Sequence, residues 1–214
     1  MRTDDLIADL AGRVGPVRPL PPPLIRAMYW LVLAAITVAA GVTVFGPRAD
    51  VMVRVAQADY LSIAVLAVCA SVFSVIVSLT LAVPGAERTP LLRVTAVAIF
   101  GIWAGTTVWE VVHEGRGLPV FTDPHWPVCF GRVVLVALLP AVMLFVMVRR
   151  GTPLRPRWTA AMATAAAASA GALAVHVACP LDDPGHVFLG HLVPVMAMAA
   201  AAVMVRRTPT STVR

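Results

Sequence analysis

The 214-residue chain contains no lysine, only three cysteines and few charged side chains. Charged residues make up 13% of the sequence and hydrophobic residues 59%, whereas soluble domains carry about 25% charged residues. Because a water-soluble core cannot hide so much apolar surface, we expect an all-α, polytopic membrane protein. Three cysteines without CxxC spacing also exclude a disulfide-rich scaffold and a paired-ligand structural zinc motif.

Six apolar runs of roughly 18–24 residues are long enough to cross a bilayer. We predict transmembrane helices over 28–45, 60–83, 91–112, 128–148, 158–178 and 187–205. They form one transmembrane domain, 28–205, between a cytoplasmic segment with a proline-rich spacer, 1–27, and a cytoplasmic tail, 206–214. A cleavable signal peptide is the competing interpretation of the first run, but its polar, proline-containing leader argues against cleavage.

The basic residues, all arginine, are distributed unevenly between the two sides of these spans. With a cytoplasmic N-terminus, the arginines that lie outside are only Arg48, Arg54, Arg116 and Arg132, whereas the rest, Arg88 among them, lie inside. Because positive charge concentrates on the cytoplasmic side, we expect both termini in the cytoplasm, an N-in/C-in topology.

Three features predict how the spans pack and where they sit in the membrane. Gly101 and Gly105 form a GxxxG pattern on the third span, and the fifth span is largely alanine over 160–178. Small faces of this kind let helix backbones approach closely. Tyr29 and Trp30 are expected at the inner membrane interface, where amphipathic rings are enriched.

The segment before the first span predicts a short amphipathic helix. Thr3 is a candidate N-cap, and Asp4 and Asp5 then occupy the first turn, which suits the positive end of the helix dipole. A helix on the lipid surface would normally carry basic residues, so docking to a basic protein is the favoured interpretation over a surface-bound or disordered segment. The expected partner-binding residues are Thr3, Asp4, Asp5, Leu6, Ile7 and Leu10.

Cys129 opens the fourth span and Cys179 closes the fifth, and a short cytoplasmic turn joins these two spans. At 1.5 Å per residue, both cysteines lie roughly 30 Å from that turn, at the same outer depth. A disulfide and a bridging soft metal ion are both open interpretations. Cys69 lies mid-span and is expected to be a packing residue.

The five histidines fall on or near the same outer side, with three aspartates. His176 and Cys179 are three residues apart on one helix face and could chelate one ion together with Cys129. The competing interpretation is that the histidines are solvated loop residues, because no short His spacing supports a metal motif. The residues in this region are His113, His125, His176, His186, His191, Asp123, Asp182 and Asp183.

Several of these features together resemble one bacterial family. The matching pieces are the Thr3-Asp4-Asp5-Leu6-Ile7 start, Ala11, Pro16-Val17 and the proline-rich stretch, six spans, Cys129, Arg149-Arg150-Gly151 in the turn, and Cys179-Pro180. In them the chain resembles the NrsF family of membrane anti-sigma factors, negative regulators of sigma F, over nearly its whole length.

The resemblance implies that the protein holds an extracytoplasmic-function sigma factor at the bacterial inner membrane and releases it under heavy-metal or oxidative stress. Cys129 and Cys179 are then the sensory residues, and a transient soft metal ion is the only cofactor expected. The expected partners are the sigma factor and the lipid bilayer, without direct contact to nucleic acid. Modification or metallation of the cysteines would shift the fourth and fifth spans and so change how the N-terminal segment holds its partner.

Two other classes of function compete with this interpretation. A membrane thiol-disulfide oxidoreductase also uses outward-facing cysteines, but such chemistry normally needs a CxxC motif or two cooperating pairs. A small metal permease is the second alternative, and the absence of Asp, Glu, Lys and Arg from the centres of the spans argues against it. We therefore expect a regulator rather than an enzyme.

Overall fold

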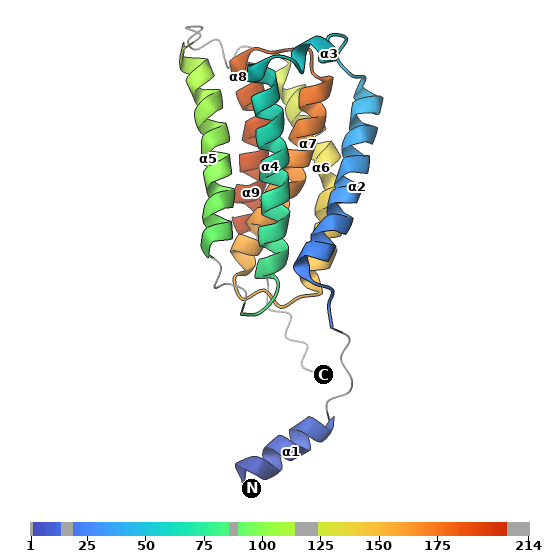
Figure 1. Ribbon diagram of the computed structural model, residues 1–214, viewed down its shortest axis with the longest axis vertical. Coiled ribbons are helices and arrows are strands. Elements are labelled where there is room, and N and C mark those ends of the chain that lie inside the picture. The colour runs from blue at the N-terminus through green and yellow to red at the C-terminus, as the bar shows by residue number, and fades with distance from the viewer. Residues whose placement is uncertain (1, 14–18, 86–89, 114–123, 205–214) are drawn as a thin grey trace.

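The computed structural model of the chain describes residues 2–13, 19–85, 90–113 and 124–204, and within them the chain is helical without strands (Figure 1). Six segments there are long and apolar enough to cross a membrane, which confirms the all-α fold with six spans. Five of them are α2 (Pro23–Phe45), α4 (Ala58–Leu81), α5 (Pro90–His113), α6 (Trp126–Arg149) and α7 (Pro156–Ala178). The sixth span, Pro184–Met204, consists of α8 (Pro184–Val187), the π-helical turn η3 (Phe188–Leu192) and α9 (Val193–Met204).

The remaining helices of the described part of the chain are two short ones, α1 (Thr3–Arg13) and α3 (Val51–Arg54). Some features predicted from the sequence lie outside the described residues. They are residues 14–18 of the N-terminal segment, the tail 206–214, Arg88, Arg116 and Asp123.

Prolines mark where several of the spans begin. α2 starts at Pro23, α5 at Pro90, α7 at Pro156 and the sixth span at Pro184. Proline suits the first turn of a helix because the N–H that it lacks would have no partner there and its φ angle is already helical. The first span therefore begins at Pro23 rather than at residue 28, and the proline-rich spacer ahead of it is correspondingly shorter.

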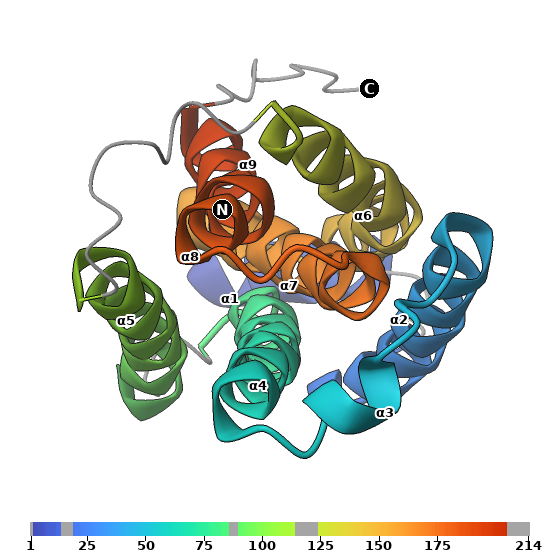
Figure 2. The ribbon, with the colours of Figure 1, turned by 90° about the horizontal axis from the view of Figure 1, so that it is seen from above.

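α7 occupies the middle of the bundle, with α2, α4, α6 and α9 packed around it (Figure 2). Most of its residues are buried, and most of the buried ones are alanine. At Gly171 a Cβ atom would lie only 2.4 Å from the carbonyl oxygen of Val133 in α6. Small residues permit this close approach, so the alanine-rich span packs as the sequence predicts.

The glycine pair of α5 packs against none of the described residues. Gly101 and Gly105 are exposed, and no described atom lies within 4 Å of the place that a Cβ atom would take at either residue. α5 lies at the edge of the bundle, against α4 and the beginning of the sixth span (Figure 2). The prediction of a close intrachain contact at this GxxxG pattern is therefore wrong.

Trp30 lies inside the bundle rather than at the membrane interface, so that prediction is also wrong. Its side chain is fully buried, and its Nε1 donates a hydrogen bond of 2.8 Å to the Pro140 carbonyl oxygen in α6. One turn earlier in α2, the Arg26 guanidinium donates to the Met147 carbonyl oxygen near the end of α6. The indole N–H needs no water because the neighbouring helix supplies its acceptor. The adjacent Tyr29, by contrast, is exposed.

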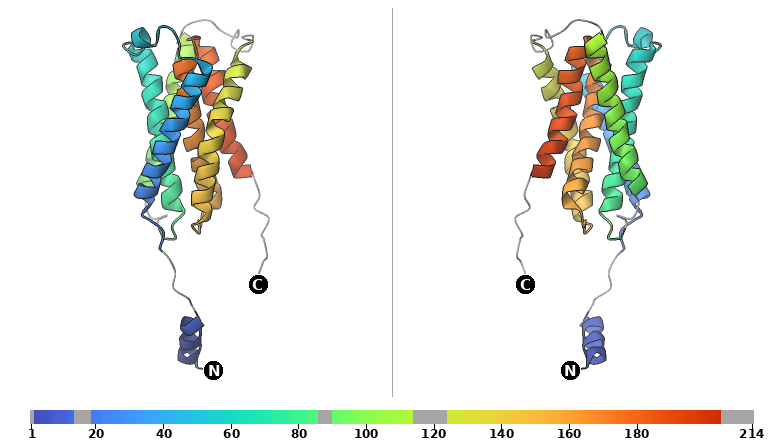
Figure 3. Two further views of the ribbon diagram at one scale, coloured as in Figure 1. Left: turned by 90° about the vertical axis from the view of Figure 1, so that its right-hand side faces the viewer. Right: turned by 90° about the vertical axis from the view of Figure 1, so that its left-hand side faces the viewer.

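The two ends of the bundle differ in what they carry. α2 begins and α9 ends at one end, whereas α3 and α8 lie at the other, which we call the distal end (Figures 1 and 3). The first turn of α6 and the last turn of α7 also reach the distal end. It therefore contains both Cys129 and Cys179.

Replacing Gly171 by alanine tests the central packing. In an exposed helix a Gly→Ala substitution stabilises by roughly 0.5–1 kcal/mol, whereas a new atom against a backbone carbonyl causes an overpacking cost of about 1–3 kcal/mol. We therefore expect Gly171→Ala to lower the free energy of unfolding in detergent, and the matched variant Gly101→Ala to leave it unchanged or raise it. Equal stability of the two variants would contradict the packing described for α6 and α7.

Candidate functional site

Cys129 and Cys179 lie at the same end of the bundle, at the equal depth that the sequence predicts, and their side chains meet there. Cys129 lies in the first turn of α6, and Cys179 directly follows the last residue of α7. Both are buried, their Sγ atoms are 3.7 Å apart, and the two thiols share a hydrogen bond. Cys69 belongs to α4 and is not part of this group.

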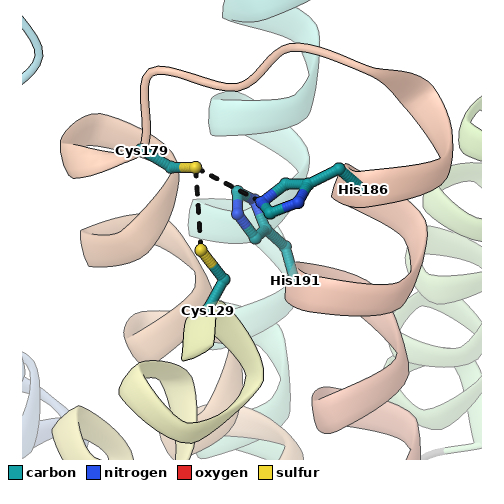
Figure 4. Close-up of side chains that lie close together, drawn as sticks. All are labelled: Cys129, Cys179, His186 and His191. Atoms are coloured by element: carbon teal, nitrogen blue, oxygen red, sulfur yellow. Dashed lines mark hydrogen bonds between the residues drawn. The ribbon is translucent and has the colours of Figure 1, made fainter. Parts of the chain in front are cut away.

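Two histidines of the sixth span join the cysteines in one group of buried side chains (Figure 4). The Nε2 atom of His186 lies 3.3 Å from the Cys179 sulfur. One ligand-type atom of each member lies within 4.8 Å of the corresponding atoms of the other three. We call the four residues the distal cluster; they are Cys129, Cys179, His186 and His191.

The π-helical turn brings the two histidines to the same side of the sixth span. His186 and His191 are five residues apart, a spacing that in a regular α-helix turns their directions apart by about 140°. In η3 the Val193 N–H bonds to the carbonyl five residues earlier, so this turn holds one additional residue. Pro194 accounts for the irregularity, since it has no N–H to offer the Gly190 carbonyl and its ring would crowd that carbonyl.

Gly190 makes room for the sixth span to approach α6. A Cβ atom at this position would lie 3.1 Å from the Cβ of Cys129 and 3.6 Å from the Nε2 of His186. A contact of 3.1 Å is too short for a comfortable carbon–carbon approach. Any larger residue here would therefore displace members of the distal cluster.

His191 has the least satisfied side chain of the cluster. The residue is 1% exposed, and neither of its ring nitrogens meets the geometry of a hydrogen bond to any residue in the described part of the chain, although the Cys179 sulfur lies within 4.8 Å of one of them. Its ring packs edge-on against the rings of His176 and His186. Because buried polar atoms are normally paired, this imidazole is well suited to bind a ligand.

The structure does not bring His176 together with the cysteines. Its ring stacks on that of Tyr60 with 4.2 Å between centroids, and its Nε2 lies 3.1 Å from the Tyr60 carbonyl oxygen. The sequence pairs His176 with Cys179 because helical residues three apart share a face. Cys179 has extended backbone angles, φ −82° and ψ 125°, so this helical rule does not apply to it.

The interpretation of the histidines as solvated residues is wrong for the majority of them. His113 and His125 are exposed, whereas His176, His186 and His191 are buried. Their sequence spacing gives no sign of this burial. The available signal is a proline within the sixth span, three residues after His191, which points to an irregular helical turn.

Arg48 anchors the segment that carries Cys179. Its side chain, 2% exposed, donates hydrogen bonds of 2.6 and 2.7 Å to the Asp182 carboxylate and of 2.7 and 3.0 Å to the Asp50 carboxylate. It also donates to the Cys179 carbonyl oxygen at 3.2 Å. Bidentate arginine–carboxylate pairs fix geometry as well as adding stability. We call Arg48, Asp50 and Asp182 the arginine clasp; it ties the segment after α2 to the segment after α7.

The distal end also changes the acidity of its groups. Hydrogen bonds from Arg48 hold the pKa of the Asp182 and Asp50 carboxyls below their ordinary values, so both remain ionised at neutral pH. The hydrogen bond with Cys129 lowers the pKa of the Cys179 thiol; burial opposes this effect, and the hydrogen bond with His186 adds to it. Cys179 therefore loses its proton more readily than an isolated thiol does.

The residues predicted to bind a partner lie on α1, which precedes the end of the bundle opposite the distal cluster (Figure 3). Thr3 is the first helical residue rather than the cap before it. The Arg2 backbone N–H donates to the Asp5 carboxylate at 3.2 Å, which closes the first turn instead. All of the predicted residues are exposed, namely Thr3, Asp4, Asp5, Leu6, Ile7 and Leu10.

Comparison with known protein families gives one match. The family NrsF, described as negative regulator of sigma F, matches residues 10–208, which include all six spans and the distal cluster. Most of α1 precedes the matched residues. No curated protein and no solved structure matches the chain. The family match agrees with the resemblance in the sequence, and the chain belongs to the NrsF family of negative regulators of sigma F.

Proposed function

We propose that the protein is an anti-sigma factor of the bacterial inner membrane that sequesters an extracytoplasmic-function sigma factor through α1. Heavy-metal or oxidative stress would act at Cys129 and Cys179 and release the sigma factor. The family assignment supports one part of this proposal, namely that the protein is a negative regulator of a sigma factor. The observation that carries the mode of binding is the exposed apolar stripe of α1.

α1 has an apolar side but buries none of its residues. Leu6, Ile7 and Leu10 are 39%, 59% and 55% exposed, and their spacing places them on one face of the helix. An amphipathic helix with such a stripe commonly binds by laying it into a hydrophobic groove of another protein. The helix thus offers a binding surface that the described bundle does not occupy.

The charge of α1 favours a basic partner. Its first turn carries Asp4 and Asp5, while Asp9 is paired with Arg13 at 2.8 Å. Opposite charge at the edge of an interface accelerates association and excludes wrong partners. Sigma factors bind DNA and core polymerase, so basic surfaces are expected on them.

The distribution of arginine supports a cytoplasmic location for α1. Described arginines are more numerous at the end of the bundle where α2 begins, and a cytoplasmic excess of positive charge is the rule for short loops. The arginines nearest that end are Arg26, Arg93, Arg149, Arg150, Arg155 and Arg157, against Arg48, Arg54 and Arg132 at the distal end. In this topology the distal cluster faces the periplasm and α1 can reach a cytoplasmic sigma factor.

α2 is a candidate connection between the two ends. At its distal end the chain enters the arginine clasp, and nearer its start Arg26 and Trp30 donate hydrogen bonds to carbonyl groups of α6. A change at the cysteines would move the ends of α6 and α7, which both contact α2. Such a movement would bias the position from which α1 is presented, as expected for a two-state switch.

Substitution of the apolar stripe tests the role of α1. The triple variant Leu6→Ala, Ile7→Ala, Leu10→Ala keeps a helix-forming sequence but removes most of the apolar surface that α1 would bury against the sigma factor. We expect the amount of sigma factor that co-purifies from native-host membranes, identified by mass spectrometry, to fall at least about tenfold. A tenfold loss is about 1.4 kcal/mol, less than the burial of one large aliphatic side chain contributes.

The matched control changes the opposite face of the same helix. Ala8→Gln with Gly12→Ala leaves the stripe intact, and no described atom lies within 4 Å of a Cβ atom at Gly12. We expect this variant to retain the sigma factor at the level of the unmodified protein. Full retention by the triple alanine variant would contradict binding through the stripe.

Serine replacement tests the sensory role of the cysteines. In the double variant Cys129→Ser, Cys179→Ser we expect a sigma-dependent reporter to become unresponsive to cadmium and to peroxide, because serine neither oxidises nor binds soft metals. Cys69→Ser is the control and should respond as the unmodified protein does. A normal stress response in the double variant would remove the cysteines from the mechanism.

The arginine clasp predicts a variant that binds but does not signal. Arg48→Gln loses the contacts to Asp182 and to the Cys179 carbonyl, so we expect several-fold weaker reporter induction while the sigma factor still co-purifies. Arg54→Gln is the control, since that arginine also contacts Asp182 but does not reach the Cys179 carbonyl in the described contacts. Full induction in Arg48→Gln would show that the clasp does not couple the two ends.

A further inference from the structure

We infer that Cys129, Cys179, His186 and His191 form a tetrahedral binding site for one thiophilic divalent cation of the Zn²⁺ and Cd²⁺ class. The inference deepens the proposed sensing role of the two cysteines by naming two further ligands and the class of ion. The role of the ion as a signal rests on the proposed function. Binding of the ion does not, because it is a property of this chain alone.

The spacing of the ligand atoms fits a tetrahedral ion. With bonds of about 2.3 Å to sulfur and 2.0–2.1 Å to nitrogen, a tetrahedral centre places two sulfurs about 3.8 Å apart and a sulfur and a nitrogen about 3.5 Å apart. The two cysteine sulfurs are 3.7 Å apart, and the Cys179 sulfur is 3.3 Å from the His186 Nε2. These three atoms therefore need only small shifts to receive an ion.

His191 supplies the fourth ligand. Its ring lies behind that of His186 and next to the sulfurs (Figure 4), with a nitrogen within 4.8 Å of each of the other ligand atoms. The ring is buried, and both of its nitrogens lack a hydrogen-bond partner among the described residues. Coordination would satisfy one of these nitrogens, which an apolar environment cannot do.

Charge balance favours a divalent ion at this buried position. Binding of the ion replaces the protons of the two thiols, which leave to water as two H⁺, while both imidazoles bind in their neutral form. The charges of two thiolates and one divalent cation sum to zero. The occupied cluster is therefore neutral, which avoids the cost of burying a net charge. Soft sulfur and imidazole nitrogen together select zinc-like ions over magnesium or calcium.

Nearby carboxylates already have other roles. Asp182 is bound by Arg48, and the Asp183 side chain accepts a hydrogen bond of 3.1 Å from the His186 backbone N–H. Both contacts hold ligand-bearing segments rather than competing for the ion. Supporting contacts of this kind orient metal ligands and strengthen binding.

The ligands come from three separate parts of the bundle. Cys129 belongs to α6, Cys179 follows α7, and both histidines belong to the sixth span. An ion bound by all four would therefore fix the distal ends of three spans relative to one another. Occupancy of the site is in this way connected to the arrangement of the bundle.

Cobalt titration tests the inference directly. The full-length chain, purified in detergent without sigma factor and kept reduced with a phosphine, is titrated with Co²⁺ and followed by visible absorption. We expect one equivalent of Co²⁺ to give the intense bands of a tetrahedral centre with sulfur-to-cobalt charge transfer, and Zn²⁺ or Cd²⁺ to abolish them. Absence of tetrahedral bands in the reduced protein would overturn the inference.

Variants identify the ligands. We expect His186→Gln and His191→Gln each to weaken Co²⁺ binding at least about a hundredfold, the upper range for loss of a supporting residue alone. His113→Gln, at an exposed position outside the cluster, should keep the affinity of the unmodified protein, whereas His176→Gln, whose ring packs against that of His191, should weaken binding less than either ligand variant. Loss of binding in His176→Gln with retention in His191→Gln would replace this ligand set by another.

The charge-transfer band gives a second measurement that does not depend on the histidine variants folding. It should disappear in Cys129→Ser, Cys179→Ser and persist in Cys69→Ser, and persistence in the double variant would overturn the inference. Metal binding without any co-purifying sigma factor would count against the proposed function only. Co-purification without metal binding would count against this inference only.

Discussion

The close approach of α6 to α7 determines where the functional residues of this protein stand. At Gly171 the backbones come so near that a single added carbon would meet the Val133 carbonyl. Cys129 lies one helical turn from Val133, and Cys179 lies two turns from Gly171, toward the same end. Backbone contact thus sets the separation of the two sulfurs, and the alanines around Gly171 allow other helices to approach α7 as well.

The sequence was sufficient to predict the six spans and the equal depth of the two cysteines, because both follow from run length and rise per residue. That the two side chains face each other depends on how α6 and α7 are rotated, which the rise per residue does not give. It was insufficient where a local irregularity changed the direction of a side chain. Cys179 leaves the helix that holds His176, and a π-helical turn rotates His191 toward His186. Trp30 was misplaced for another reason, since its acceptor belongs to a helix far away in the sequence.

Apolar contacts between the helices do not require a particular orientation of the groups that touch. The polar contacts between helices do, so they decide which segments move together. One set joins α4 to α7, where the hydroxyls of Tyr60, Ser71 and Ser78 donate to backbone carbonyls. A second set holds α2 and its continuation to α6 near one end and to the segment after α7 at the other. Hydrogen bonds in a low-dielectric interior are costly to leave unmade. A displacement of Cys179 therefore either carries the arginine clasp with it or breaks it, and intermediate positions are unfavourable.

A π-helical turn is a turn within an α-helix that contains one residue more than a regular α-helical turn. The alignment of His186 with His191 depends on that extra residue, whereas the length and hydrophobicity of the sixth span do not. A homologous chain one residue shorter at η3 would still cross the membrane and pack on α7. The cluster of four side chains can therefore be gained or lost by a single-residue insertion or deletion, without any change in the architecture that surrounds it.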